Sequence, residues 1–359
     1  MIQDFKIFLF KKIKLFNGRM PAMEFLGNHI LSIDQFDRTD IEKIFATSDD
    51  LVPFANRQKI TRVLQGAILS NMFFEASTRT RISFGSAFNI LGGEVRETTG
   101  VEATSLSKGE SLYDTSRVLS GYSDIIVMRH PDAGSVKEFA NASRVPVING
   151  GDGDNEHPSQ ALLDLYTINK ELLSKKKTID GLRISLVGDL KYGRAVHSLC
   201  KVLALFDNIS VNLVSPKKLE LPDSLKLNFD KNSVSFIETD DIKQGISDVD
   251  IIYMTRIQEE RFSSKAESEK YKGLMSINQE IYTKNCEPNT IIMHPLPRDS
   301  RPDANELDPD LNQNPNLAIY RQTDNGLLIR MALFALVLGV ENKVQATASN
   351  INWFSKKTN

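Results

Sequence analysis

The sequence has no long apolar segment, few cysteines and almost no net charge. No run of 18 or more apolar residues occurs among its 359 residues, which argues against a membrane-spanning helix. Its two cysteines, Cys200 and Cys286, allow neither a disulfide framework nor a four-sulfur metal site, so we expect a reducing compartment, the cytoplasm. The 44 Lys and Arg nearly balance the 46 Asp and Glu, which excludes the broad basic surface typical of nucleic-acid binding. Any cationic site must be local.

Common nucleotide-binding and nucleophile motifs are also missing. The segment 188–194 follows an apolar run, as a dinucleotide-binding loop would, but Leu190 stands where G-x-G-x-x-G requires glycine. Neither G-x-x-x-x-G-K-[ST] nor G-x-S-x-G occurs, and no histidine pair has the spacing of a metal site. We therefore expect chemistry without a covalent enzyme intermediate, a metal or another cofactor.

Short apolar runs followed at once by polar clusters recur along the chain. Six such runs have the length of strands, and they cover residues 67–74, 125–128, 145–148, 184–187, 251–254 and 291–293. Helical periodicity commonly follows the polar cluster, as in Phe84, Phe88 and Leu91, before Gly92 ends that pattern. Alternating strands and helices predict parallel, doubly wound sheets, in which ligands bind at the carboxyl ends of the strands. All six polar clusters are predicted at such ends.

The spacing predicts an α/β fold of two domains, each a doubly wound parallel sheet flanked by helices. The first three runs form one sheet, and the other three join further strands at 211–214 and 234–237 in a second. A helix starting at Pro158 connects the sheets, and an apolar helix over 326–339 packs back on the first domain. The expected boundaries are an N-terminal extension at 1–24, one domain at 25–160 plus 325–342, and another at 161–324.

The cluster Ser77-Thr78-Arg79-Thr80-Arg81 has the pattern of a helix N-terminus with Ser77 as the N-cap. Arginines in a first helical turn face the positive end of the helix dipole, which costs about 0.3–1 kcal/mol per exposed charge. Their placement is favourable when an anion such as phosphate accepts N–H, hydroxyl and guanidinium hydrogen bonds there. Glu75 is expected to hold Arg79 or Arg81 when that anion is absent.

Three of the five histidines precede proline, which fixes the local backbone. His157 leaves a Gly-rich segment and begins a helix, so we interpret it as a group that polarises a substrate carbonyl. His130 and His294 are expected to be structural. The polar clusters contain four arginines, Arg79, Arg129, Arg194 and Arg256, to which Lys108 outside the clusters is a candidate addition. Together they predict a site for small polyanions, because unpaired buried charges need neutralisation.

These motifs together resemble the aspartate/ornithine carbamoyltransferase family, over residues 29–339. The sequences at 77–81 (S-T-R-T-R) and 157–160 (H-P-S-Q) are shared by both branches. The sequences at 254–258 (M-T-R-I-Q) and 294–298 (H-P-L-P-R) resemble the aspartate branch. The resemblance implies transfer of a carbamoyl group from carbamoyl phosphate to L-aspartate in pyrimidine biosynthesis. It also implies a homotrimer with shared active sites and no cofactor or metal.

The resemblance carries site roles to residues of this sequence that match the motifs. The groups implied to act in catalysis are Arg79, Lys108, Arg129 and His157. Carbamoyl phosphate is expected to contact Ser77, Thr78, Arg79, Thr80, Arg129, His157, Gln160 and the backbone carbonyls of Leu296 and Pro297. L-Aspartate is expected to contact Arg194, Arg256, Gln258 and Lys108. A loop of the neighbouring subunit is expected to supply Lys108 together with a serine that is either Ser105 or Ser107.

The sequence departs from the family pattern at Ala76, where many relatives have proline, and at Gly150, where alanine is usual. The stretch 299–306 looks altered and longer, which leaves its geometry open. Two alternative functions also remain: a carbamoyltransferase with a different amine acceptor, and an inactive relative that serves as a binding or assembly subunit. The sequence does not decide whether regulatory chains or other pathway enzymes associate, or what the extension does.

Overall fold

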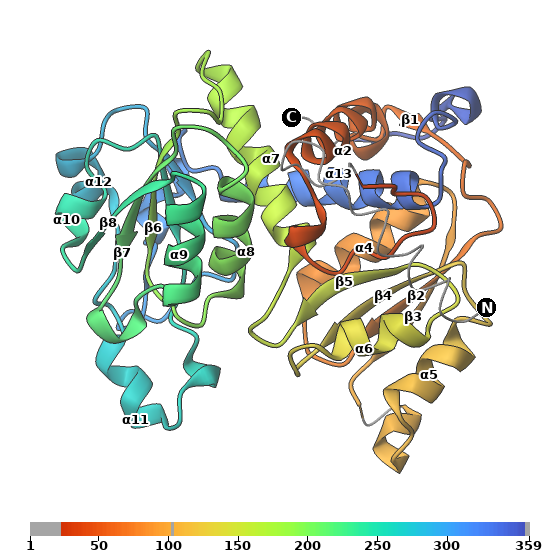
Figure 1. Ribbon diagram of the computed structural model, residues 1–359. Coiled ribbons are helices and arrows are strands. Elements are labelled where there is room, and N and C mark those ends of the chain that lie inside the picture. Colours follow the sequence, from red (N-terminus) through yellow and green to blue (C-terminus); the bar gives the residue numbers. More distant parts are fainter. Residues whose placement is uncertain (1–22, 102–103, 356–359) are drawn as a thin grey trace, which may run out of the picture.

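The computed structural model describes residues 23–101 and 104–355, so most of the expected extension at 1–24 lies outside the described residues. Two α/β lobes stand side by side, with helix α7 (Pro158–Ser174) between them (Figure 1). Each lobe contains a parallel sheet with helices on both faces, which confirms the predicted fold class.

The sheet of the first lobe has the order β3-β2-β4-β5, and all its pairings are parallel. Its strands are β2 (Ile68–Phe73), β3 (Glu94–Thr99), β4 (Ile125–His130) and β5 (Val147–Asp152). The helices of this lobe are α2 (Arg38–Asp50), α3 (Val52–Ala55), α4 (Thr78–Ile90), α5 (Leu112–Leu119) and α6 (Ser135–Ala142), with short 3₁₀ turns η1 (Ile33–Gln35) and η2 (Ser105–Lys108).

The sheet of the second lobe has the order β10-β9-β6-β7-β8 and is also parallel. Its strands are β6 (Arg183–Val187), β7 (Ser210–Val214), β8 (Ser235–Thr239), β9 (Ile251–Met254) and β10 (Ile291–Met293). Its helices are α8 (Arg194–Leu203), α9 (Asp223–Lys231), α10 (Ile242–Gly245), α11 (Lys265–Ser268) and α12 (Gln279–Asn285), with 3₁₀ turns η3 (Lys217–Leu219), η4 (Glu259–Arg261), η5 (Glu269–Tyr271) and η6 (Pro309–Gln313).

The long helix α13 (Ile319–Val337) leaves the second lobe and packs in the first (Figure 1). Phe334 on α13 meets Phe84 and Phe88 on α4, with ring centroids 5.8 and 5.0 Å apart in edge-on contacts that stabilise the interface. The chain then passes η7 (Gln345–Thr347) to β11 (Ser349–Asn350), which pairs antiparallel with β1 (Lys59–Ile60). One buried core therefore continues from the first lobe through α7 and α13 into the second.

The sequence missed one strand of the first sheet. Strand β3 lies at the sheet edge, where most of its side chains are exposed. Its sequence, Glu-Val-Arg-Glu-Thr-Thr, therefore lacks the apolar run that marks a buried strand. Strands β4 and β5 extend through residues expected in the polar clusters, because their ends remain buried and paired as far as His130 and Asp152.

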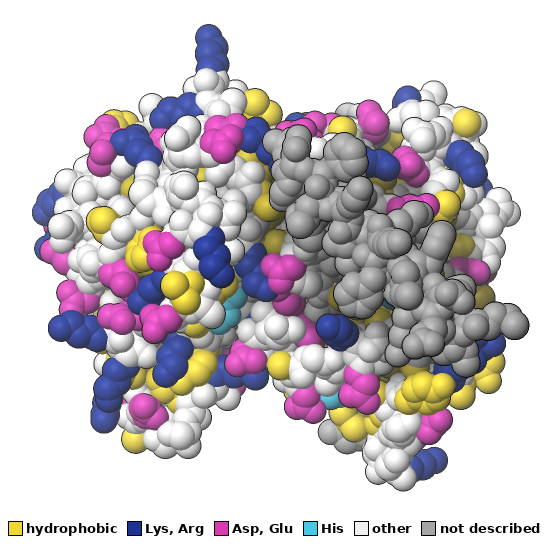
Figure 2. Space-filling model, viewed as in Figure 1, with side chains coloured by type: hydrophobic (Ala, Val, Ile, Leu, Met, Phe, Trp, Pro, Cys, Tyr) yellow, Lys and Arg dark blue, Asp and Glu magenta, His cyan; other side chains and the backbone are white. Residues whose placement is uncertain are grey.

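Acidic and basic side chains of the described residues are mixed over the part of the face that Figure 2 shows in colour. Among the helices that the structure describes, none is both long and apolar enough to cross a bilayer.

Candidate active site

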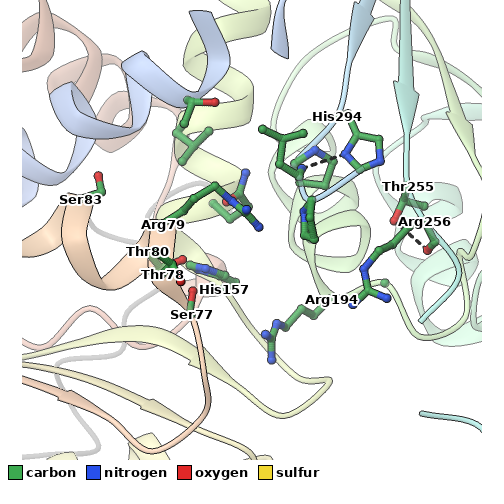
Figure 3. A pocket seen from close by; sticks show the side chains of 18 of the residues that line it. Ser77, Thr78, Arg79, Thr80, Ser83, His157, Arg194, Thr255, Arg256 and His294 are labelled. Atoms are coloured by element: carbon green, nitrogen blue, oxygen red, sulfur yellow. Dashed lines mark hydrogen bonds between the residues drawn. The ribbon is translucent and has the colours of Figure 1, made fainter. Parts of the chain in front are cut away.

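A cavity of about 400 Å³ opens where the two lobes meet. All six predicted polar clusters line it, and they come from the carboxyl ends of β2, β4, β5, β6, β9 and β10. In Figure 3, Ser77, Arg79 and His157 face it from the first lobe, and Arg194 and Arg256 face it from the second. The lining includes five arginines but only two carboxylates, Glu75 and Glu260, so the cavity is strongly cationic.

The N-terminus of α4 presents free donors to this cavity. Ser77 is the N-cap residue, but its hydroxyl makes no capping hydrogen bond, so it remains available to a ligand. Thr78 and Thr80 line the cavity beside it. The first-turn N–H groups of a helix have no intrahelical acceptor, and together with these hydroxyls they form a site suited to a phosphate.

Glu75 connects arginines of both lobes. Its Oε2 lies 3.0 Å from Nε of Arg129, in the first lobe, and 3.2 Å from a terminal nitrogen of Arg194, in the second. Its Oε1 lies 3.8 Å from Arg261, also in the second lobe. One carboxylate therefore provides the countercharge for three guanidinium groups, and the remaining positive charge is left for a ligand.

The expected pairing of Glu75 with Arg79 or Arg81 is wrong. Arg81 lies 3.8 Å from Glu97 instead, since the helix directs it away from the cavity toward β3. Arg79 makes no ion pair with any described residue, and the pKa of its guanidinium is lowered by desolvation and by the nearby charge of Arg256. It is a cation without a protein countercharge, as an anion site requires.

Arg129 and His157 form the buried floor of the cavity, with exposures of only 8% and 5%. Burial, together with the charge of Arg194, lowers the pKa of Arg129 to about 10, so it stays charged at neutral pH. Burial and the charges of Arg129, Arg194 and Arg330 hold the pKa of His157 well below 6.5. The imidazole is therefore neutral and can donate a single N–H to a substrate oxygen.

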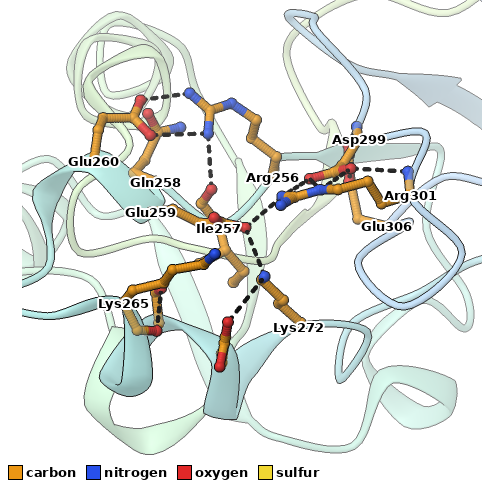
Figure 4. A network of polar contacts seen from close by, with 12 residues as sticks. Arg256, Ile257, Gln258, Glu259, Glu260, Lys265, Lys272, Asp299, Arg301 and Glu306 are labelled. Carbon is orange, nitrogen blue, oxygen red and sulfur yellow. Dashed lines mark hydrogen bonds and ion pairs between the residues drawn. The ribbon is translucent and has the colours of Figure 1, made fainter.

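The second-lobe side of the cavity is built on two loops that follow β6 and β9. Arg256 donates to Glu260 over 3.1 and 2.5 Å, which fixes the plane of its guanidinium (Figure 4). The buried carboxylate of Asp189 accepts from the backbone N–H groups of Tyr192 and Gln258, each over 3.0 Å. These hydrogen bonds tie together the loops that present Arg194, Arg256 and Gln258.

The stretch 299–306, whose geometry the sequence left open, is anchored to the same region. Arg301 pairs with Asp299 in its own loop and with Glu259 next to Gln258 (Figure 4). The backbone N–H of Asp299 donates to the buried carboxylate of Glu306 over 3.1 Å. The loop at 299–306 is thus tied to the loop that carries Arg256.

His294 has both ring nitrogens engaged within the protein. Its Nδ1 accepts from the backbone N–H of Leu296 over 2.8 Å, and its Nε2 lies 2.7 Å from Glu306. Nδ1 of His130 likewise accepts from the N–H of Asp132. Both histidines thus hold backbone turns, as expected. Among the described residues, no cluster of three or more His, Cys, Asp or Glu side chains could bind a metal ion.

Comparison with known proteins identifies the family. The family model "Aspartate/ornithine carbamoyltransferase, carbamoyl-P binding domain" matches residues 28–170, and the model "Aspartate/ornithine carbamoyltransferase, Asp/Orn binding domain" matches residues 180–337. The chain belongs to the aspartate/ornithine carbamoyltransferase family. The resemblance inferred from the motifs is therefore confirmed.

Similar members of this carbamoyltransferase family are the aspartate carbamoyltransferase catalytic subunits of Cellvibrio japonicus and Saccharophagus degradans. The first is 65% identical over 93% of this chain and 98% of its own length, and the second 64% identical over 94% and 100%. A solved structure of Trypanosoma cruzi aspartate transcarbamoylase in complex with carbamoyl phosphate and aspartate has a TM-score of 0.79. It is 35% identical and covers 89% of this chain and 98% of its own. The catalytic subunit of M. jannaschii aspartate transcarbamoylase has a TM-score of 0.79 at 41% identity, with 88% and 99% covered.

Sequence reasoning missed several residues that line the cavity of this carbamoyltransferase: Ser83, Thr255, Glu260, Gln322, Thr323 and Arg330. Arg330 is 4% exposed on α13 and donates to Ser83 over 2.9 Å. Burial lowers the pKa of Arg330 to about 10. A signal was present, because a single arginine interrupts the apolar run at 326–339, and a buried arginine requires a partner or a ligand.

Two predicted site residues are not brought to the cavity. Ser105 and Lys108 lie on η2 with exposed side chains and do not line the cavity of their own chain, and neither does Ser107. All the other predicted site residues do line it, in one chain.

Proposed function

We propose that this chain transfers the carbamoyl group of carbamoyl phosphate to the amine of L-aspartate, which gives N-carbamoyl-L-aspartate and phosphate. One observation carries the proposal: five arginines line a single cavity against only two glutamates. A dianionic acyl phosphate and a dicarboxylate together supply the missing negative charge. The complex of the Trypanosoma cruzi relative with carbamoyl phosphate and aspartate supports these substrates.

Carbamoyl phosphate binds mainly to the first lobe. The phosphate accepts hydrogen bonds from the N-terminus of α4, through Ser77, Thr78, Arg79 and Thr80. Arg129 and His157 donate to the carbamoyl oxygen, with Arg129 also reaching the phosphate. The carbamoyl amide donates to Gln160 and to the backbone carbonyls of Leu296 and Pro297.

Aspartate binds mainly to the second lobe, where Arg194, Arg256 and Gln258 hold its two carboxylates. Its amine nitrogen attacks the carbamoyl carbon, and a new C–N bond forms as the C–O bond to phosphate breaks. Developing charge on the carbamoyl oxygen is stabilised by Arg129 and by the neutral N–H of His157. The departing phosphate takes the amine proton, so no protein base, metal or covalent intermediate is required.

Most of the rate acceleration comes from holding two mutually repelling anions in contact. Orientation of this kind contributes up to about 7–11 kcal/mol in favourable cases. The arginines make the approach possible because they neutralise both substrates within one enclosed cavity. This accounts for the placement of so many cations at the junction of two lobes.

The active enzyme is a homotrimer in this proposal, because Lys108 and its loop serine, Ser105 or Ser107, do not line the cavity of their own chain. A neighbouring subunit supplies them to the aspartate side of the site. We assign residues 25–160 plus 325–342 to carbamoyl phosphate and 161–324 to aspartate, and we place the enzyme in the cytoplasm, within pyrimidine biosynthesis.

A carbamoyl-transfer assay with the purified chain tests the proposal. We expect equal amounts of phosphate and carbamoyl aspartate with L-aspartate, and strong inhibition by an analogue that combines a phosphonate with two carboxylates. Carbamoylation of ornithine or another amine in preference to aspartate would identify a different acceptor. Binding of carbamoyl phosphate without product would identify an inactive binding subunit.

A further inference from the structure

Asp164 is a buried carboxylate that the proposed reaction does not use. It lies on α7, is 0% exposed, and makes no ion pair with a lysine or arginine of the described residues. Its Oδ1 accepts from Nε2 of Gln160 over 2.9 Å and from Nε2 of Gln322 over 2.6 Å. Its Oδ2 accepts from the hydroxyl of Tyr253 over 2.7 Å. The charge of the buried Arg330 stabilises this carboxylate from beyond ion-pair distance, so its direct partners are three neutral donors.

The carboxylate fixes the orientation of Gln160. Burial raises the pKa of Asp164 to about 6, so at neutral pH it is ionised and only accepts hydrogen bonds. Gln160 must therefore turn its NH₂ group toward Asp164. Its Oε1, which accepts no hydrogen bond from any described residue, is then the polar atom left for the cavity that Gln160 lines.

The same carboxylate fixes Gln322. With its NH₂ on Asp164, Gln322 uses Oε1 to accept from the backbone N–H of His294 over 3.0 Å. His294 in turn accepts from the N–H of Leu296. The Asp164 carboxylate, at the junction of α7, β9 and α13, thereby positions two acceptors for the carbamoyl amide. It holds Oε1 of Gln160 directly and the carbonyl of Leu296 through Gln322 and His294.

We propose that Asp164 is a positioning residue that makes this end of the cavity accept hydrogen bonds only, and so selects a substrate carrying NH₂ over one carrying a methyl group. The inference rests on the proposed function. Carbamoyl phosphate offers two N–H donors at this position, whereas acetyl phosphate, of nearly the same shape, offers none. A site built to accept N–H groups strongly disfavours an analogue without them, because its acceptors are left unpaired.

The test compares the affinities of carbamoyl phosphate and acetyl phosphate in the trimer. In Asp164→Asn, the new amide can donate to Gln160, which removes the requirement that the Oε1 of Gln160 face the substrate. We expect the affinity for carbamoyl phosphate to fall about 10- to 100-fold, as for loss of hydrogen bonds held by a charged group, and that for acetyl phosphate to change much less. The matched control, Tyr253→Phe, removes a hydrogen bond to the other oxygen and so raises the pKa of Asp164 further. All variants are therefore compared at about pH 8.5, where Asp164 stays ionised, and there Tyr253→Phe should leave the ratio of affinities unchanged while lowering Tm.

Gln160→Ala keeps the inference testable if Asp164→Asn does not fold. Gln160→Ala alone should reduce the preference for carbamoyl phosphate over acetyl phosphate. Adding Asp164→Asn to the Gln160→Ala variant should reduce this preference little further. An equal loss for both ligands in Asp164→Asn, or an unchanged ratio in Gln160→Ala, overturns the inference. The affinity measurements test the inference only after the wild-type protein has been shown to form carbamoyl aspartate. Absence of that product in the wild type overturns the proposed function itself.

Discussion

The Nε atom of Arg129 lies 3.0 Å from Oε2 of Glu75, and both groups face the cavity between the lobes. The same oxygen lies 3.2 Å from Arg194 in the opposite lobe. Glu75 therefore orients one group that we assign to carbamoyl phosphate and another that we assign to aspartate. It also provides a direct ionic link across the cavity.

Replacement of Glu75 by glutamine should weaken the use of aspartate more than that of carbamoyl phosphate. Arg194 and Arg261 would lose their ionic link to the first lobe, whereas Arg129 remains packed in its buried position. We expect kcat/KM for aspartate to fall about tenfold, as for loss of a hydrogen-bonded charged pair. Steady-state kinetics with each substrate varied in turn measure this difference.

Glu94→Gln is the matched control, because Glu94 is exposed on β3 and, within the described part of the chain, pairs only with the equally exposed Arg96. It should leave both kinetic constants unchanged, as exposed ion pairs contribute little. An unchanged KM for aspartate in Glu75→Gln would contradict the role given to this carboxylate.

His157 should remain neutral at pH values where an ordinary imidazole is half protonated. Its pKa is held well below 6.5 by burial and by the arginines around it. A depressed pKa means that the unfolded chain takes up the proton first, so this residue reduces stability only as the pH falls below about 6.5. Histidine-selective ¹⁵N NMR at pH 6.5, with His157→Gln to assign the signal, should show a neutral ring. A half-protonated ring at that pH would exclude the assigned state.

Arg79 should be required for turnover, because it stands at the N-terminus of α4 and no carboxylate of the described residues pairs with it. Arg79→Ala should lower kcat about 10²–10³-fold, the loss found when one charge-stabilising donor is removed. Arg96→Ala, at an exposed position, serves as control and should be nearly unaffected. Near-normal turnover by Arg79→Ala would refute the phosphate site on α4.

The cavity lining was largely predictable, because in a parallel sheet the residues that follow the strands meet at one edge. This rule places Ser77, Arg129, His157, Arg194 and Arg256 together without knowledge of the family. The same rule does not predict which carboxylates pair with these arginines. Which carboxylate meets which arginine depends on how the two lobes face each other, and no local pattern encodes that.

Residues contributed from helix interiors were the hardest to find. Gln322 and Arg330 lie on α13, far along the sequence from the end of β10, and they reach the cavity because α13 crosses from one lobe to the other. Strand β3 was missed for a different reason, since an exposed edge strand carries no buried apolar run. In each case tertiary position, rather than local sequence, determines the role.

The exposed position of Lys108 on η2 leads to a prediction about assembly. If each site takes Arg79 from one chain and Lys108 from its neighbour, homotrimers of either alanine variant should have little activity. A mixed trimer would contain one intact site, where a chain with native Arg79 meets a neighbour with native Lys108.

Coexpression of the two variants with different tags, followed by purification through both tags, should therefore restore part of the activity. The control pair, Arg79→Ala with Arg129→Ala, should restore none, because both residues line the cavity of the same chain. If Lys108 instead served its own chain, mixing would regain nothing, and the shared site would be ruled out.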